Sequence, residues 1–177
     1  MKAILSVYDK TGIEELAKVL SNNGFDLIST GGTYKKIIEN PSLANTKVSQ
    51  VSDITKSPEI LDGRVKTLHP KVFGGILSRR DHEGDREQMA QYAIPNIDLV
   101  VVDLYPFEET VASGASEEAI IEKIDIGGIA LISPRRKHFP RERGFFAVGP
   151  KNRCDCFWVC VGCCFGYLFH CSPNPAD

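Results

Sequence analysis

Residues 1–132 contain no cysteine, and the chain has no long hydrophobic run. All six cysteines lie in the last 24 residues, so the first 132 residues make no use of disulfides, as is typical of cytosolic proteins. The apolar run Ala3–Val7 is cut off by Asp9 and is too short for a signal peptide. The uncharged stretch Phe157–Phe169 has 13 residues, fewer than the roughly 20 that a membrane-spanning helix needs. We therefore expect a soluble, cytoplasmic protein with no membrane partner.

A large excess of positive charge is also missing. The formal net charge is −2, which provides no general attraction to nucleic acid or to an anionic membrane. We therefore expect no nucleic-acid partner. In residues 1–132 no set of His, Cys and carboxylate side chains has the spacing of metal ligands, so we expect no metal site there.

What the sequence does contain divides it into two parts. The whole is 42% hydrophobic and 25% charged, as in a globular protein with a buried core. From Ser133 onward the composition changes: residues 133–177 have no Ile and one Leu, but six Phe, five Arg, five Pro and every cysteine. We expect one domain over residues 1–132 and an irregular Cys-, Arg- and Phe-rich tail over residues 133–177.

Short apolar runs alternate with amphipathic segments along residues 1–132. Strands are predicted at 2–7, 25–28, 48–51 and 99–104, and the last is nearly all apolar and therefore central in the sheet. Helices are predicted from a capping box of Thr11 and Glu14 to Gly24, from about Tyr34 to 40, and at 83–93 and 116–123. Residues 52–78 read as loop-rich. The β-α-β-α order predicts an α/β fold with a parallel central sheet flanked by helices.

Two predicted strand-to-helix turns could hold an anion. The first carries Lys10, and the second is Thr30-Gly31-Gly32-Thr33. Both turns leave the same edge of a parallel sheet, where open α/β sheets bind ligands. Glycines there let backbone N–H groups approach a phosphate at a helix N-terminus. The alternative is a plain β-to-α turn.

Further polar residues follow in the segment 61–70. In an extended chain Arg64 and Lys66 project to the same side, and two cations suit a phosphate or a developing oxyanion. A solvated basic loop is the alternative. For His69 alone we favour a structural hydrogen bond. Tyr105 at the end of a strand reads by itself as a half-buried tyrosine. Asp125 precedes a Gly-Gly pair that lets the backbone come close to a ligand, and it could equally be a helix or turn cap.

Five segments, read in order, resemble the IMP cyclohydrolase domain, which forms the N-terminal part of a family of bifunctional purine biosynthesis proteins. The resemblance covers residues 1 to about 132. It is carried by Val7-Tyr8-Asp9-Lys10-Thr11-Gly12, Ser29-Thr30-Gly31-Gly32-Thr33, Gly63-Arg64-Val65-Lys66-Thr67-Leu68-His69-Pro70, Leu104-Tyr105-Pro106-Phe107 and Ile124-Asp125-Ile126-Gly127-Gly128.

The resemblance implies a methylglyoxal-synthase-like fold, usually dimeric, and one reaction that uses no metal or organic cofactor. In that reaction 5-formamidoimidazole-4-carboxamide ribotide (FAICAR) loses water and closes to inosine monophosphate (IMP). The implied catalytic residues are Lys66, Tyr105, Asp125 and Lys137. The implied nucleotide-binding residues are Tyr8, Asp9, Lys10, Thr30, Gly31, Gly32, Thr33, Arg64, Val65 and Thr67, with Val102, Asp103, Asp125 and Ile126 at the base and Gly127 and Gly128 beside it.

The resemblance ends near Ser133. Family members carry a catalytic lysine in the segment Arg-Ala-Ala-Ala-Lys-Asn. Lys137 falls at that spacing, but inside Ser133-Pro134-Arg135-Arg136-Lys137-His138. The family domain also continues further and is commonly fused to a folate-dependent transformylase domain, so we expect a truncated domain here. We interpret residues 133–177 as the product of a frameshift or an aberrant junction. The coding DNA, aligned in all three frames, contradicts this if no frame continues the family sequence.

Three alternatives stay open. A zinc module in the tail is the first, although only Cys160 and Cys163 have Cys-x-x-Cys spacing and the six cysteines match no closed four-ligand pattern well. The second is a catalytically impaired nucleotide-binding or regulatory module of the same fold, for which IMP binding without turnover would be the sign. The third is methylglyoxal synthase, which the runs 64–70 and 104–107 disfavour.

Overall fold

Five parallel strands form one sheet in the order β3-β2-β1-β4-β5. The computed structural model describes residues 1–61, 63–133 and 144–148, the last of these as backbone alone. The strands are β1 Lys2–Ser6, β2 Asp26–Ser29, β3 Val48–Gln50, β4 Leu99–Asp103 and β5 Gly144–Val148. The predicted parallel sheet is confirmed, and β4 lies inside it, between β1 and β5, as its apolar sequence indicated.

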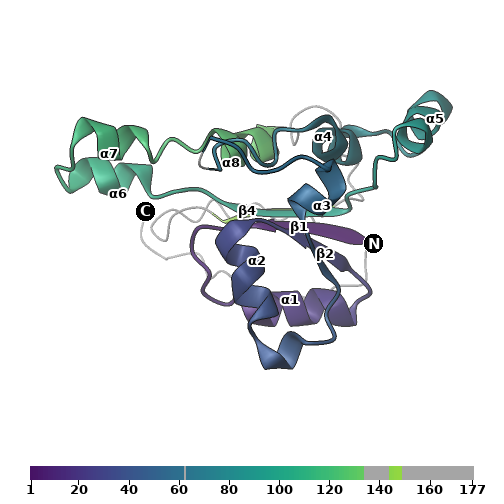
Figure 1. Cartoon of the computed structure of the whole chain (residues 1–177), viewed down its shortest axis with the longest axis horizontal. Coiled ribbons are helices and arrows are strands. Elements are labelled where there is room, and N and C mark those ends of the chain that lie inside the picture. Colours follow the sequence, from purple (N-terminus) through teal and green to yellow (C-terminus); the bar gives the residue numbers. More distant parts are fainter. Residues whose placement is uncertain (62, 134–143, 149–177) are drawn as a thin grey trace, which may run out of the picture.

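Helices cover both faces of this sheet (Figure 1). α1 Ile13–Asn22 and α2 Gly31–Ile38 lie on one face, and α3 Val51–Thr55, α4 Pro70–Leu77 and α8 Ile126–Ile132 lie on the other. Alternate residues of β1 serve the two layers, because successive side chains of a strand point to opposite faces. Ala3 and Leu5 pack in the core beneath α1 and α2, whereas Ile4 packs with residues of α4 and α8.

The remaining helices extend the molecule. α5 Glu83–Gln91 and the pair α6 Phe107–Ala112 and α7 Glu117–Ile121 project from opposite ends (Figure 1). We call α6 and α7 the arm; none of their residues is buried. A 3₁₀ turn, η1 Pro41–Leu43, follows α2. Within the described part of the chain no helix is long and apolar enough to cross a membrane.

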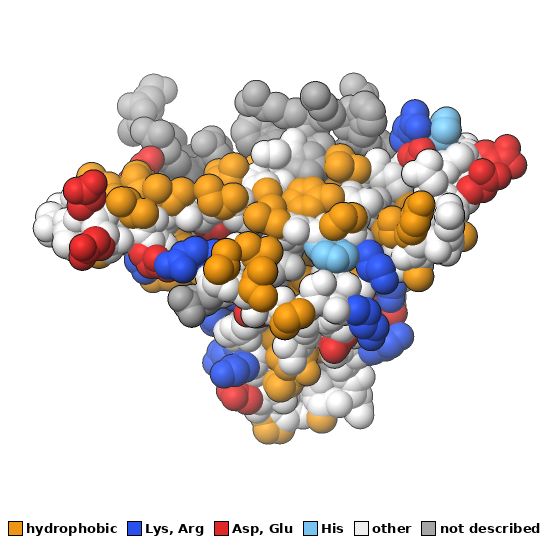
Figure 2. Space-filling model, turned by 45° about the horizontal axis from the view of Figure 1, so that its top comes forward, with side chains coloured by type: hydrophobic (Ala, Val, Ile, Leu, Met, Phe, Trp, Pro, Cys, Tyr) orange, Lys and Arg blue, Asp and Glu red, His pale blue; other side chains and the backbone are white. Residues whose placement is uncertain are grey.

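Hydrophobic side chains gather along the arm and over α8, where Figure 2 shows them as an exposed band. Val111 and Ile121 on the arm and Ile126 and Ile129 on α8 are between 46% and 61% exposed. Within residues 1–61 and 63–133 none of these four side chains is buried. An exposed apolar surface of this kind is typical of an interaction surface rather than of a solvated face.

The structure adds to two local predictions and corrects one of them. α1 does not begin with a capping box: Gly12 is its N-cap with φ +74°, and no side chain caps it. The Thr11 hydroxyl instead donates to Asp9 Oδ1 at 2.6 Å, because a short polar side chain next to a carboxylate bonds locally. Residues 52–78 are loop-rich, as predicted, but they also hold two helices that the sequence did not predict, α3 at one end and α4 at the other.

Residues 144–148 also differ from the irregular tail expected beyond residue 132, because they form β5 and pair with β4. Their sequence Gly-Phe-Phe-Ala-Val is rich in residues that favour strands. The division of the chain at residue 132 stays a prediction. Lys137 lies outside the described residues.

Candidate functional site

The loops that carry the candidate residues leave one edge of the sheet. β1 and β4 are paired so that Ser6 lies opposite Val102, and Ser29 of β2 lies opposite Leu5. Because these strands are parallel, their carboxyl ends meet at this edge. The segments 7–10, 30–33 and 103–105 therefore start side by side, although they are distant in the sequence.

The second of these segments is the N-terminus of α2 rather than a separate turn. Thr30 is the N-cap, and Gly31, with φ +41°, is the first helical residue. A Cβ on Gly32 would lie 3.0 Å from Lys10 Cε, and one on Gly31 would lie 3.3 Å from Lys66 Nζ. Two lysine side chains thus reach the N-terminal end of an eight-residue helix whose first N–H groups have no helical partner. Cations and free N–H groups together are what a phosphate requires.

Each of these lysines has a partner. Lys10 Nζ donates to the Tyr8 carbonyl at 2.9 Å. Lys66 Nζ lies 3.2 Å from Glu59 Oε2 and is 27% exposed. Gly63 makes room for Lys66, because a Cβ there would approach Lys66 Cε to 2.5 Å, and φ +81° at Gly63 disfavours any other residue. The Lys66 ammonium is therefore held in place beside α2 by a carboxylate that an anionic ligand would have to displace.

Arg64 does not share that direction. Its backbone N–H bonds to Leu61 O at 3.0 Å, so the segment turns instead of extending. Arg64 Nη2 reaches Glu122 Oε2 at 2.6 Å, at the end of the arm. The expectation that Arg64 and Lys66 project together from an extended chain was wrong, because the turn sends them to different carboxylates. Val65 forms an isolated antiparallel bridge with Ile60.

Threonine hydroxyls fasten the loops to each other. Thr33 Oγ1 donates to Val7 O at 3.0 Å and accepts the Val7 N–H at 3.4 Å, and Thr30 Oγ1 lies 3.3 Å from Ser6 Oγ. Thr33 is buried. The resemblance implied ligand contacts for these threonines, but Thr33 already uses its hydroxyl to tie α2 to the segment after β1.

Asp103 is a buried carboxylate at the end of β4. Its Oδ2 accepts the Asp9 N–H at 2.8 Å. Burial raises the pKa of the Asp103 carboxyl, and the hydrogen bond from Asp9 opposes this rise. The neighbouring Val102 is buried in the core with α4 and α8, so only its backbone is placed to meet a ligand.

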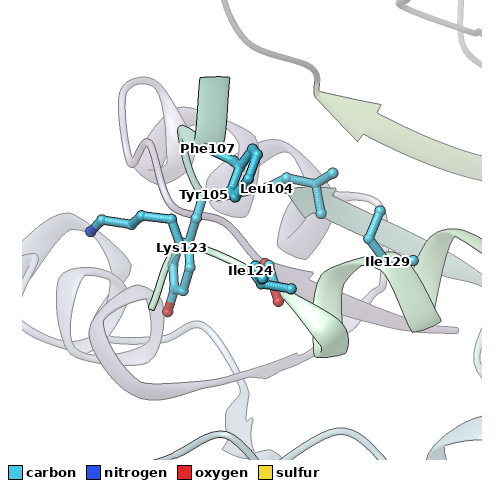
Figure 3. A pocket seen from close by; sticks show the side chains of 7 residues that line it. Leu104, Tyr105, Phe107, Lys123, Ile124 and Ile129 are labelled. Carbon is cyan, nitrogen blue, oxygen red and sulfur yellow. The ribbon is translucent and has the colours of Figure 1, made fainter. Parts of the chain in front are cut away.

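Tyr8 and Tyr105 meet edge to face, with ring centroids 5.2 Å apart and an interplanar angle of 76°. Lys123 Nζ lies 5.7 Å from the centre of the Tyr8 ring and 5.6 Å from that of Tyr105. A cavity of about 260 Å³ opens beside them (Figure 3). It is lined by Leu104, Tyr105, Phe107, Lys123, Ile124, Asp125 and Ile129. Lys123 was not among the predicted residues, because it belongs to no motif and meets the tyrosines only in the folded chain.

Asp125 lines the cavity and also caps α8, since its Oδ1 accepts the Gly128 N–H at 2.7 Å. The cap interpretation made from the sequence is confirmed. A Cβ on Gly128 would come within 2.5 Å of both Asp125 Oδ2 and Leu104 Cδ2, so this glycine is required for packing. A Cβ on Gly127 would meet Thr67 Oγ1 at 3.4 Å, which brings the buried Thr67 next to α8. Ile126 is exposed.

His69 is the N-cap of α4, where its Nδ1 accepts the Lys71 N–H at 3.1 Å. The structural role expected for it is confirmed. Across residues 1–61 and 63–133, no three His, Cys, Asp or Glu side chains are grouped so as to hold a metal ion.

Comparison with known proteins identifies relatives over the same part of the chain. A family model described as MGS-like domain matches residues 12–130. The bifunctional purine biosynthesis protein PurH of Bacteroides thetaiotaomicron is 56% identical over 137 residues, which is 77% of this chain and 26% of that protein. The purH protein of Dictyostelium discoideum is 52% identical over 140 residues, which is 78% of this chain and 25% of that protein. The chain thus spans about a quarter of the length of these curated relatives.

A solved structure agrees with the sheet and helices described above. The crystal structure of ForH matches with a TM-score of 0.60 and 38% sequence identity, covering 76% of this chain and 66% of that chain. The family model itself covers more than half of the chain. The chain belongs to the family of MGS-like domains.

Proposed function

We propose that this chain binds a purine nucleotide intermediate and catalyses the closure of FAICAR to IMP. One observation carries the proposal: Lys10 and Lys66 flank the N-terminus of α2, at the same sheet edge as Tyr105 and Asp125. The resemblance to PurH proteins, whose name places them in purine biosynthesis, supports the choice of substrate. Because the chain spans only a quarter of those proteins, their full activity is not carried over.

The proposed chemistry needs few groups, because the reacting atoms sit on neighbouring positions of one ring. The carboxamide nitrogen attacks the formyl carbon and gives up a proton, and the oxyanion that forms is protonated. The resulting hydroxyl leaves as water with the proton of the formamide nitrogen, which closes the ring. Proximity is therefore supplied by the substrate, and the protein must hold the two groups in line and stabilise charge. One well-placed oxyanion donor lowers the activation barrier by on the order of 3 kcal/mol.

The residues divide between two tasks. Lys10 and the N–H groups at Gly31 and Gly32 bind the phosphate of the ribotide. Lys66 and Tyr105 assist the amide and formyl groups, and Asp125 orients a proton donor. Positioning by the protein matters because general acid–base help is worth about 10²–10⁴-fold only when the proton is within reach.

A binding or regulatory module of the same fold is the second candidate. The observation that favours it is the sequence 133–138, where family members have Arg-Ala-Ala-Ala-Lys-Asn and this chain has Ser-Pro-Arg-Arg-Lys-His. Binding of IMP without turnover of FAICAR would identify such a module. A homodimer and a cytoplasmic location, both expected from the sequence, stay predictions.

Replacing Lys66 by methionine tests the proposal. Ultraviolet-monitored conversion of FAICAR should slow by about 10²–10³-fold, because one charged donor is lost at the reacting atoms. Lys35→Met is the matched control, since Lys35 lies in the last turn of α2, away from the glycines, and its replacement removes the same charge. Equal rates for Lys66→Met and the unaltered chain would remove Lys66 from the catalytic set.

Lys10 has a separate test, because its proposed task is binding. Lys10→Met should weaken IMP binding by about 10–100-fold, the worth of one charge-assisted hydrogen bond. Isothermal titration calorimetry measures the dissociation constant, again with Lys35→Met as the control. Unchanged affinity would place the phosphate elsewhere.

A further inference from the structure

Two consecutive residues at the end of α7 contact three loops of the candidate site. Glu122 follows α7 directly and pairs with Arg64 at 2.6 Å. Lys123 Nζ lies within 6 Å of the ring centres of both Tyr8 and Tyr105. These loops follow β1, precede α4 and follow β4, so the pair connects segments that the sheet alone does not join.

The arm is largely exposed in the part of the chain that the structure describes. No residue of α6 or α7 is buried, and the arm projects beyond the sheet (Figure 1). In Figure 3 the Lys123 side chain passes beside Tyr105 and points away from Leu104 and Ile129. Lys123, which follows the C-cap residue of α7, therefore faces the tyrosine pair rather than the apolar side of the cavity.

The Arg64–Glu122 pair is poorly suited to stabilise the fold. Its side chains are 56% and 58% exposed, and exposed ion pairs contribute little to stability because water and salt screen them. What such a pair can do is select one direction for a long side chain. The planar guanidinium of Arg64 also donates to Leu61 O at 3.4 Å, and Glu122 holds its other end.

The Lys123 ammonium acts on the tyrosines in a similar way. A cation near a ring is attracted by the negative face of the π-system. Placed at nearly equal distances from two rings that already meet edge to face, it favours one relative orientation of Tyr8 and Tyr105. The Tyr105 hydroxyl is thereby directed with the ring that carries it.

We propose that Glu122 and Lys123 are positioning residues: Glu122 fixes the guanidinium of Arg64 for the nucleotide, and Lys123 fixes the ring of Tyr105 for the ring closure. The inference rests on the function proposed above and deepens it. It separates binding from chemistry, because the family resemblance implies nucleotide binding for Arg64 and catalysis for Tyr105.

Glu122→Ala tests the first half. IMP binding and the KM for FAICAR should each weaken roughly tenfold, since misplaced binding groups cost up to about 10²-fold, while kcat stays within twofold. Glu118→Ala, which removes the same charge from the exposed first turn of α7, is the control and should change neither value. Glu122→Gln should recover part of the affinity, because its amide oxygen still accepts from Arg64. The melting temperature should not move, as expected for an exposed pair.

Lys123→Met tests the second half. Here kcat should fall roughly tenfold with little change in KM, and Lys123→Arg should restore it because arginine keeps the cation over the rings. The ring resonances of Tyr8 and Tyr105 should shift in spectra of the ¹³C-tyrosine-labelled full chain, whereas those of Tyr34 and Tyr92 should not.

The proposed function and the positioning roles would each fail in a recognisably different way. An unaltered chain that neither binds IMP nor converts FAICAR overturns the proposed function, and the positioning roles fall with it. An active unaltered chain whose Glu122→Ala and Lys123→Met variants match it in KM, kcat and affinity overturns the positioning roles alone.

Discussion

Replacing Gly75 by alanine is expected to destabilise the domain, although a Gly→Ala change inside a helix is usually favourable. Gly75 lies in α4 and is buried. An added Cβ would collide with the Pro95 carbonyl oxygen and would lie 2.9 Å from Ile97 Cδ1. The Ile97 N–H also donates to Gly75 O at 3.1 Å. The helix is thus bonded to the same backbone that the new methyl group would push away.

The magnitude follows from two opposing effects. Alanine in a helix interior gains about 1 kcal/mol over glycine. Overpacking a close-packed site costs typically about 1–3 kcal/mol, and backbone atoms give less than side chains. Because the Pro95 carbonyl belongs to the backbone, we expect a cost near the upper end of that range, about 2–3 kcal/mol, and so a net loss of about 1–2 kcal/mol in the free energy of unfolding. For a chain of this size that loss lowers the melting temperature by about 2–8 °C.

Urea unfolding and thermal melting followed by circular dichroism measure the effect. Gly74→Ala is the matched control in the same helix, because its added Cβ would meet only the flexible Ile94 side chain, at 3.1 Å. That variant should stay within about 1 kcal/mol of the unaltered chain. A Gly75→Ala protein that melts at or above the unaltered temperature would refute the packing described for α4.

Three further predictions concern polar side chains at the carboxyl edge of the sheet. Burial raises the pKa of Asp103 above 3.8, so the native state holds that proton more tightly and the contribution of Asp103 to stability falls as pH rises from 3.8 through the raised pKa. Asp103→Asn lacks this fall, and its unfolding free energy relative to the unaltered chain should rise with pH; a difference independent of pH would contradict the burial argument. Asp125→Asn should keep the cap of α8 and its stability but lose turnover, whereas Asp125→Ala should also lose about 0.5–2 kcal/mol; full activity in Asp125→Asn would leave only the cap. Thr33→Val should cost about 1–3 kcal/mol, because the backbone groups of Val7 lose their partner, while Thr33→Ser should be nearly neutral in chemical denaturation.

The sheet was predictable because each of its main strands can be recognised from its own short stretch of sequence. β1 and β4 are continuous apolar runs, and such runs are buried on both faces of a parallel sheet. Because strands alternate with helices along the chain, the strands are expected to be parallel, and their carboxyl ends therefore lie at one edge of the sheet. The turn 30–33 and Lys10 were assigned to that edge from the sequence, and the structure brings Lys10 within 3.0 Å of the position of a Cβ on Gly32.

Helix boundaries depended on contacts that periodicity does not show. α4 was missed because its sequence Pro-Lys-Val-Phe-Gly-Gly-Ile-Leu contains two glycines, which are poor helix formers. The structure shows that Gly75 is required there by close contact with residue 95. α1 begins at Ile13 with Gly12 as its N-cap and has no capping box, because Asp9 takes the Thr11 hydroxyl.

Sequence by itself determined the class of fold, the edge of the sheet where the candidate residues gather, and the family to which they belong, since apolar periodicity and local motifs are read one segment at a time. Only the tertiary structure decided which cations point to which carboxylates, sending Arg64 to Glu122 and Lys66 to Glu59. It also brought Lys123 to the two tyrosines. Pairings of this kind depend on the paths of separate loops in space, and the spacing of residues along one segment carries no information about them.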